Sequence, residues 1–266
     1  MPFEEAMQSL ARRDVLPSAL TSAQQRQQFA AGFHRQNFTS AQTLLTDLLD
    51  GYKEKIGSIL NPTTQQRADR VTETNPEGNV STGLDVPTAR LEIKQLLQKI
   101  GYQPGEGKAG TIQDLASDAR INLVFQTNKD VMQGAGQFVQ SQDEQVLVAF
   151  PAWELIRVEA RKQERDWAQR WQMCARIVGD VGAARVLDTT GRMMARKDSA
   201  IWQALGDGMD GSDDTLGNPF PPFAFNSGMD VRDIAWSEAV ELEIIQPGDT
   251  IAPRLPADLS QLFRAA

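Results

Sequence analysis

Apolar residues recur at spacings of three and four along the stretch that begins at Thr111, and this period is typical of an amphipathic helix. Thr111 is the expected N-cap residue, with Asp114 at the position that a capping box fills with Glu or Gln. A polar break at Thr127 and Asn128 interrupts the pattern. The apolar positions are Ile112, Leu115, Ala119, Leu123, Val131, Ala135 and Phe138. The stretch therefore predicts one long central helix.

The hydrophobic period changes to two after this helix. Residues 152–159 alternate in the manner of a strand. Helical spacing returns over residues 162–178, where the apolar stripe consists of Trp167, Trp171, Cys174 and Val178. A helix, a strand and a helix joined by short links predict the centre of one compact domain.

Further helical patterns lie on both sides of this centre. They cover residues 3–13, 40–60, 89–100, 198–205, 237–242 and 256–264. The apolar face of residues 40–60 is so broad that we expect it to pack on more than one side or to serve in an assembly. Gly101 is the expected C-cap of the helix at 89–100.

The domain organisation follows from a change in composition at residues 61–88. This segment has three prolines, two glycines and few large apolar residues, which predicts a linker or an extended arm. The sequence thus predicts an α+β fold that is predominantly α-helical. We expect an N-terminal helical region at 1–60, the linker or arm at 61–88, and a helix-rich core domain with a small β element at 89–266.

Composition narrows the class of protein. With 266 residues, 41% of them apolar and 23% charged, the chain can bury the core of one large or two smaller soluble domains. No apolar run is long enough to cross a bilayer, and the start MPFEEAMQSLARR lacks the apolar core of a signal peptide, so we expect no membrane association. The single cysteine suits a reducing cytoplasm, and one cysteine with one histidine is too few for a zinc site.

The net charge of −8 argues against sequence-independent DNA binding, which depends on many contacts from Lys and Arg to phosphates. Arginines and lysines cluster between Arg157 and Arg176, but acidic residues are interleaved with them. This pattern favours a solvated face of mixed charge over a nucleic-acid site. We expect at most a weak contact with DNA.

The candidate motifs for catalysis or ligand binding do not have the residue spacing that these sites require. The Gly-rich loop at 101–110 lacks the pattern of a phosphate-binding loop, and the acidic loop at 207–214 lacks the ligand spacing of a calcium hand, which favours a solvated loop. His34 and Cys174 lie in apolar surroundings that favour packing. No set of nucleophile, base and oxyanion donor is visible, so we expect no catalytic residue, no cofactor and no metal.

Two features are candidates for binding a protein partner. Glycines in the long helix predict the close approach of another backbone, by internal packing or, as the less favoured alternative, at a docking surface. The Pro- and Phe-rich segment at 218–225 is expected to present exposed rings to a groove, so that replacing its phenylalanines with Ala would weaken partner association more than folding. The candidate residues are Phe220, Pro221, Pro222, Phe223, Phe225, Asn128, Gly134 and Gly136.

Three sets of segments follow one another along the chain. The first pairs FEEAMQSLARRDVLPSAL with FTSAQTLLTDLL, the second pairs INLVFQTNKDVMQGAGQF with FPAWELIRVEA, and the third pairs KDSAIWQALGDG with NPFPPFAFNSGMDVRDI. In this order they resemble the phage minor head (head morphogenesis) proteins of the Mu F-like family. The resemblance covers most of the chain apart from the expected linker.

The resemblance implies a low-copy virion component that associates with the portal protein, and with the scaffold or major capsid protein, during head assembly. Such a protein acts in the host cytoplasm during assembly and in the virion head, with a role in DNA packaging or ejection. Many members carry a His and a Cys-Arg-Cys where this chain has Lys197-Asp198-Ser199 and Asn226-Ser227-Gly228-Met229, so no metal or disulfide role is carried over. The alternatives are a DNA-binding virion protein and, less favoured, an enzyme or toxin.

Overall fold

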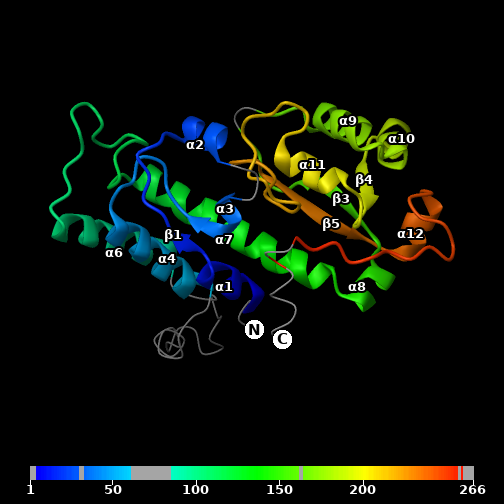
Figure 1. Cartoon of the computed structure of the whole chain (residues 1–266), viewed down its shortest axis with the longest axis horizontal. Helices are drawn as coiled ribbons and strands as arrows, with labels where there is room; N and C mark the ends of the chain where they lie inside the picture. Colours follow the sequence, from blue (N-terminus) through cyan, green and yellow to red (C-terminus); the bar gives the residue numbers. More distant parts are fainter. Residues whose placement is uncertain (1–3, 30–32, 61–84, 162–163, 257–258, 260–266) are drawn as a thin grey trace, which may run out of the picture. The chain divides into compact units, whose positions relative to one another are not determined.

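Helices dominate the computed structural model, which describes residues 4–29, 33–60, 85–161, 164–256 and 259 (Figure 1). Short strands form a two-stranded and a three-stranded sheet among these residues. The predicted α+β fold with predominant helix is therefore confirmed. No helix in these ranges combines the length and the apolar character needed to cross a membrane.

The chain divides into two compact units at a place that the sequence did not indicate. Unit 1 comprises residues 1–25 and 36–133, and unit 2 comprises residues 26–35 and 134–266. This division does not coincide with the boundaries predicted after residues 60 and 88, and the helix that follows residue 85 packs on the helix that ends at residue 60. Residues 61–84 of the expected linker, and most of the expected helix at 256–264, lie outside the described residues.

Unit 1 is built around a helix whose apolar face is covered on several sides. Its elements are α1 (Glu4–Ala11), β1 (Asp14–Val15), β2 (Asn37–Phe38), α4 (Thr46–Leu60), α6 (Val86–Lys99) and the first part of α7 (Asp118–Ser141). Helix α4 packs against α1, α6 and β1, as its broad face predicted, and buries Leu48, Leu49, Tyr52, Ile56 and Leu60. Helices α2 (Ser22–Gln28) and α3 (Phe33–Gln36) lie where the chain passes between the units.

Local hydrogen bonds explain where the helices of unit 1 begin. Residues 40–45 were expected in a helix, but Arg120 donates to the Ser40 hydroxyl at 2.6 Å and holds this segment outside α4. Helix α7 begins at Asp118 rather than near Thr111, because Asp114 accepts the backbone N–H groups of Gly110 and Ala116 in a turn. Gly101 has a φ of 72° and ends α6 as expected.

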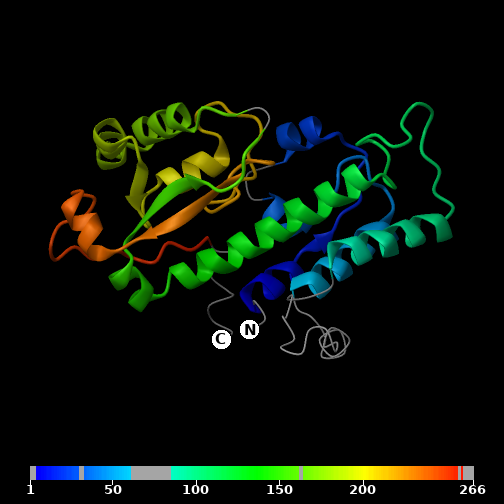
Figure 2. The same ribbon diagram turned by 180° about the vertical axis from the view of Figure 1, so that it is seen from behind.

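Unit 2 is organised around an antiparallel sheet in the order β4-β3-β5, seen from behind in Figure 2. Its elements are the end of α7, α8 (Glu144–Ala149), β3 (Ala152–Arg157), α9 (Trp167–Val178), α10 (Val181–Thr190), β4 (Met193–Arg196), α11 (Ile201–Asp207), β5 (Met229–Ile234) and α12 (Trp236–Glu241). Trp153 and Leu155 of β3 face a core that also contains residues of α7, α9 and α11. Ala152 belongs to a second core with Met194 and Ile234, on the side that α12 covers.

Candidate functional site

The Pro- and Phe-rich segment at 218–225 is part of the core of unit 2. The rings of Phe220 and Phe223 are both 0% exposed. Phe220 lies 5.3 Å from Phe138 and Phe223 lies 6.0 Å from Trp202, measured between ring centroids. The expectation of exposed rings is therefore wrong for Phe220 and Phe223, because neighbouring aromatic side chains enclose them. Phe225 is half-buried.

The glycines of α7 serve internal packing. A Cβ on Gly134 would lie 1.8 Å from the carbonyl oxygen of Pro221, so only a glycine allows this approach. Gly136 is also buried, as is Pro221, whereas Pro222 is half-buried. Internal packing, the favoured interpretation of these glycines, is confirmed at Gly134. Asn128 lies in unit 1, where its amide donates to the Val124 carbonyl at 2.9 Å within the same helix.

Three of the clustered arginines are engaged inside unit 2 rather than solvated. Arg165 and Arg170 both contact the Asp214 carboxylate, at 2.5 Å through Nε and at 2.9 Å through Nη1 respectively. Arg165 also donates to the Phe225 carbonyl at 2.7 Å, and Arg161 donates to the Asn226 carbonyl at 3.1 Å. The expectations of a solvated face of mixed charge and of a solvated acidic loop are therefore wrong for Arg165, Arg170 and Asp214, because these side chains neutralise one another.

Glu154 is the centre of a second charged network, which lies on the sheet. Its side chain is 10% exposed and accepts two hydrogen bonds from Arg192, at 2.8 and 2.7 Å, and others from Arg232. The hydrogen bonds from Arg192 hold the pKa of Glu154 below its ordinary value, against the opposing effect of desolvation. Arg192 also pairs with Glu238 at 2.9 Å. Two carboxylates balance two guanidinium groups, so the network is nearly neutral and offers no net attraction to an anion.

Lys197 carries a buried charge. Its side chain is 0% exposed, its ammonium lies 2.7 Å from Asp233 Oδ1, and it sits 5.5 Å from the centroid of the Trp153 ring. Lys197 and Asp233 therefore form an ion pair. Burial lowers the pKa of Lys197.

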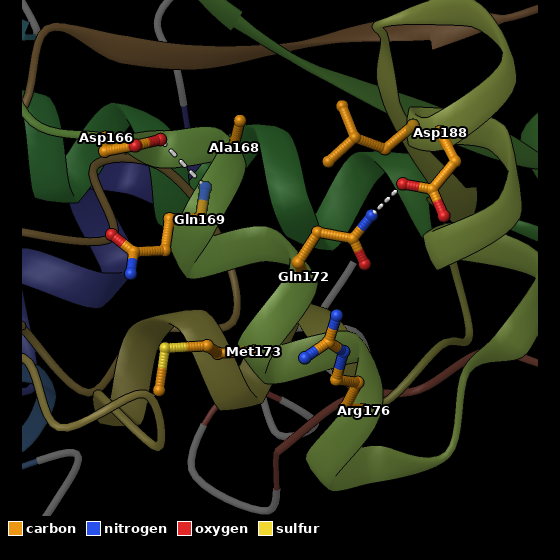
Figure 3. A pocket seen from close by; sticks show the side chains of 8 residues that line it. Asp166, Ala168, Gln169, Gln172, Met173, Arg176 and Asp188 are labelled. Carbon is orange, nitrogen blue, oxygen red and sulfur yellow. Dashed lines mark hydrogen bonds between the residues drawn. The ribbon is translucent and has the colours of Figure 1, made fainter.

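A further feature with the shape of a binding site is a groove between α9 and α10, shown in Figure 3. It encloses about 610 Å³ and is lined by Asp166, Ala168, Gln169, Gln172, Met173, Arg176, Leu187 and Asp188. The Gln172 amide crosses to the Asp188 carboxylate at 2.5 Å and ties the two helices together. The opposite face of α9 buries Trp171 and Cys174, so the helix is firmly anchored under the groove.

The chemistry of this groove suits a protein side chain. Ala168, Met173 and Leu187 provide apolar surface, and amide and carboxylate groups surround it. Cys174 lies behind it with a fully buried thiol, whose pKa burial raises to about 11. Within the described ranges, no three or more His, Cys, Asp or Glu side chains are grouped so that they could hold a metal ion.

The sequence interpretation missed this groove because it did not predict α10. Without that helix, Leu187 and Asp188 could not be placed beside Gln172. A signal was present, since Asp180 is an N-cap that accepts the Ala183 N–H at 2.9 Å, and glycines bound the segment at positions 179 and 191. No protein-family model, no curated protein and no solved structure matches this chain.

Proposed function

We propose that this chain is a minor capsid (head morphogenesis) protein of a tailed phage or prophage, which associates with the portal vertex during head assembly. The observation that carries the proposal is spatial. The segments that carry the resemblance to the Mu F-like family are far apart in sequence. In the structure they nevertheless contact one another through residues on which the resemblance rests.

The contacts of unit 2 link the second and third sets of segments. The glycine of QGAGQF, Gly134, lies against Pro221 of NPFPPF, and strand β3 of FPAWELIR pairs along its length with β5 of MDVRDI. Within the third set, a Cβ on Gly206 would lie 1.8 Å from the carbonyl oxygen of Asn218. These positions restrict the backbone, so the resemblance concerns residues that a shared fold would require.

The first set of segments is linked in the same way within unit 1. Strands β1 and β2 pair in parallel, with Val15 opposite Phe38, and Ser18 forms a bridge with Thr43. The two segments of the first set are therefore also neighbours in space. The pairing of these two segments within unit 1 supports the proposal independently of the contacts within unit 2.

The proposed partners are the portal protein and the scaffold or major capsid protein. The proposed locations are the host cytoplasm during assembly and the virion head. The net charge of −8 favours protein partners over the DNA backbone. The engagement of Arg161, Arg165 and Arg170 in internal contacts leaves fewer cations for phosphates. A role in DNA packaging or ejection would accordingly act through the portal.

Quantitative mass spectrometry of purified particles and of immature heads from the source strain tests the proposal. We expect this chain in a fixed, low ratio to the portal protein in one or both. The major capsid protein serves as the internal standard for particle number. Absence of the chain from both preparations contradicts the proposal, and salt-sensitive binding of the purified protein to duplex DNA would favour the DNA-binding alternative.

A further inference from the structure

The outward face of α9 carries opposite charges at its two ends. Asp166 is the N-cap, and its carboxylate accepts the Gln169 N–H at 2.9 Å. Arg176 is exposed in the last turn of the helix. Neither side chain forms an ion pair with another residue in the part of the chain that the structure describes. The face therefore has two charges of opposite sign that lack a charged partner.

Apolar surface lies between and beyond these charges. Met173 is 39% exposed on the wall of the groove, and Ile177 and Val181 continue the apolar surface with exposed fractions of 54% and 77%. An apolar patch beside a groove, bordered by charge, has the composition of a protein interface. We refer to Asp166, Gln169, Met173, Arg176 and Ile177 as the α9 face.

We propose that the α9 face binds the α9 face of a second copy of this chain, with the two helices antiparallel. A pairing that places Asp166 opposite Arg176 of the second copy brings the same two residues together again at the other end, as a two-fold contact requires. The same alignment places Gln169 opposite Met173 of the second copy, because both pairs share one midpoint on the helix. Both charges are then paired, and the groove of each copy receives apolar side chains from the other.

Charge complementarity favours a second copy of this chain as the partner of the α9 face. A face with one acidic and one basic end repels itself in a parallel arrangement and attracts itself in an antiparallel one. The tie between Gln172 and Asp188 keeps the groove formed before association, which lowers the ordering cost of binding. The inference stands whether or not the proposed function is correct.

Sedimentation equilibrium of the full chain across a concentration series tests the association. We expect a reversible dimer, and we expect Arg176→Glu to raise its Kd roughly tenfold or more, because the new carboxylate would face Asp166 at both ends of the contact. Arg157→Glu is the matched control, since Arg157 is an exposed arginine of unit 2 outside the α9 face. The control should dimerise like the unaltered chain. A chain that stays monomeric, or a dimer that the two variants weaken equally, overturns the proposal.

Cysteine cross-linking tests the antiparallel alignment separately. A mixture of Gln169→Cys and Met173→Cys should form a disulfide-linked heterodimer faster than either variant alone, because only the mixed pair brings the two positions face to face. The native Cys174 is fully buried, so the unaltered chain serves as the background control. Equal rates in the mixture and in the single variants overturn the alignment. Capture of a different protein by a chain that does not cross-link assigns the face to that partner and overturns the proposal as well.

Discussion

Gly134 and Pro221 touch at a place where no side chain fits. A Cβ added to Gly134 would lie 1.8 Å from the carbonyl oxygen of Pro221 and 3.1 Å from Cδ2 of Phe220. The backbone of the Pro- and Phe-rich segment therefore rests directly on α7. This approach sets the depth to which the aromatic rings of that segment enter the core of unit 2.

Gly134→Ala should destabilise the protein by about 1–3 kcal/mol, because the added methyl group must displace the backbone of Pro221. The gain in helix propensity, about 1 kcal/mol, offsets only part of this cost. Gly182→Ala in α10 is the control, since its Cβ would meet only Asp180 Oδ1, at 3.5 Å, and its stability should be unchanged or slightly raised. Chemical denaturation measures both variants. Equal stability of the two would contradict the close approach.

Replacing Phe220 or Phe223 with Ala should cost about 3–5 kcal/mol of folding stability each, because both rings are fully buried. This reverses the expectation from the sequence alone, in which partner association suffered more than folding. Phe225→Ala should cost less, since Phe225 is only half-buried. The measurement is denaturant unfolding of the three single variants. A loss at Phe220 or Phe223 no larger than that at Phe225 would restore the earlier interpretation.

Strong periodicity made parts of unit 2 predictable. The stripe of Trp167, Trp171 and Cys174 identified the buried face of α9, and the alternation around Trp153 identified β3. In α9 one face is buried and the other is exposed, so the pattern of apolar positions records the geometry directly, whereas residues 152–155 of β3 are buried on both faces. Glycine at position 134 likewise signalled a close backbone.

Other features depended on contacts between distant residues. Strand β4 has only four residues, and its sequence, Met-Met-Ala-Arg, does not alternate, so its pairing with β3 could not be read locally. Helix α7 begins at Asp118 and not near the predicted cap at Thr111, because the Ser117 hydroxyl accepts the Arg120 N–H at 3.1 Å. The Pro- and Phe-rich segment has a composition that suits a binding surface or a core, and only packing decides between them.

Glu154→Gln should lower stability by about 1–3 kcal/mol near neutral pH, because the amide cannot take charge-assisted bonds from Arg192 and Arg232. The pKa of Glu154 is lower in the folded protein than its ordinary value, so the folded state binds this proton more weakly than the unfolded state. The stability that Glu154 contributes is therefore complete above the ordinary pKa of a glutamate. It is lost as the pH falls through the lowered pKa.

The difference in unfolding free energy between the unaltered chain and Glu154→Gln should accordingly shrink on going from about pH 7 to about pH 3. Glu241→Gln, at an exposed position of α12, is the control and should differ little from the unaltered chain at neutral pH. Urea denaturation over a pH series gives all three curves. A difference that stays constant over the acidic range would show that the ion pairs contribute no pH-dependent stability.

Lys197 and Asp233 form an ion pair in which only one partner is buried, and this asymmetry predicts unequal effects of removing either one. The Lys197 side chain is 0% exposed, whereas that of Asp233 is 46% exposed. Lys197→Met leaves a carboxylate that water and the Trp153 N–H, at 3.0 Å, can still solvate, so we expect a change within about 1 kcal/mol. Asp233→Asn leaves a buried ammonium without its counter-ion and should cost about 3–5 kcal/mol near neutral pH.

The pH dependence separates this cause from a simple loss of packing. Burial lowers the pKa of Lys197 in the folded protein, and removing Asp233 removes the interaction that opposes this effect. The unfolded state then binds the proton more tightly, so the stability of Asp233→Asn should rise as the pH increases from the lowered pKa towards the ordinary pKa of lysine. The double variant should behave like Lys197→Met and lack this rise, because no ammonium remains. If Asp233→Asn instead shows a constant deficit up to about pH 10, the cost comes from altered packing or hydrogen bonding at residue 233 and not from the buried charge.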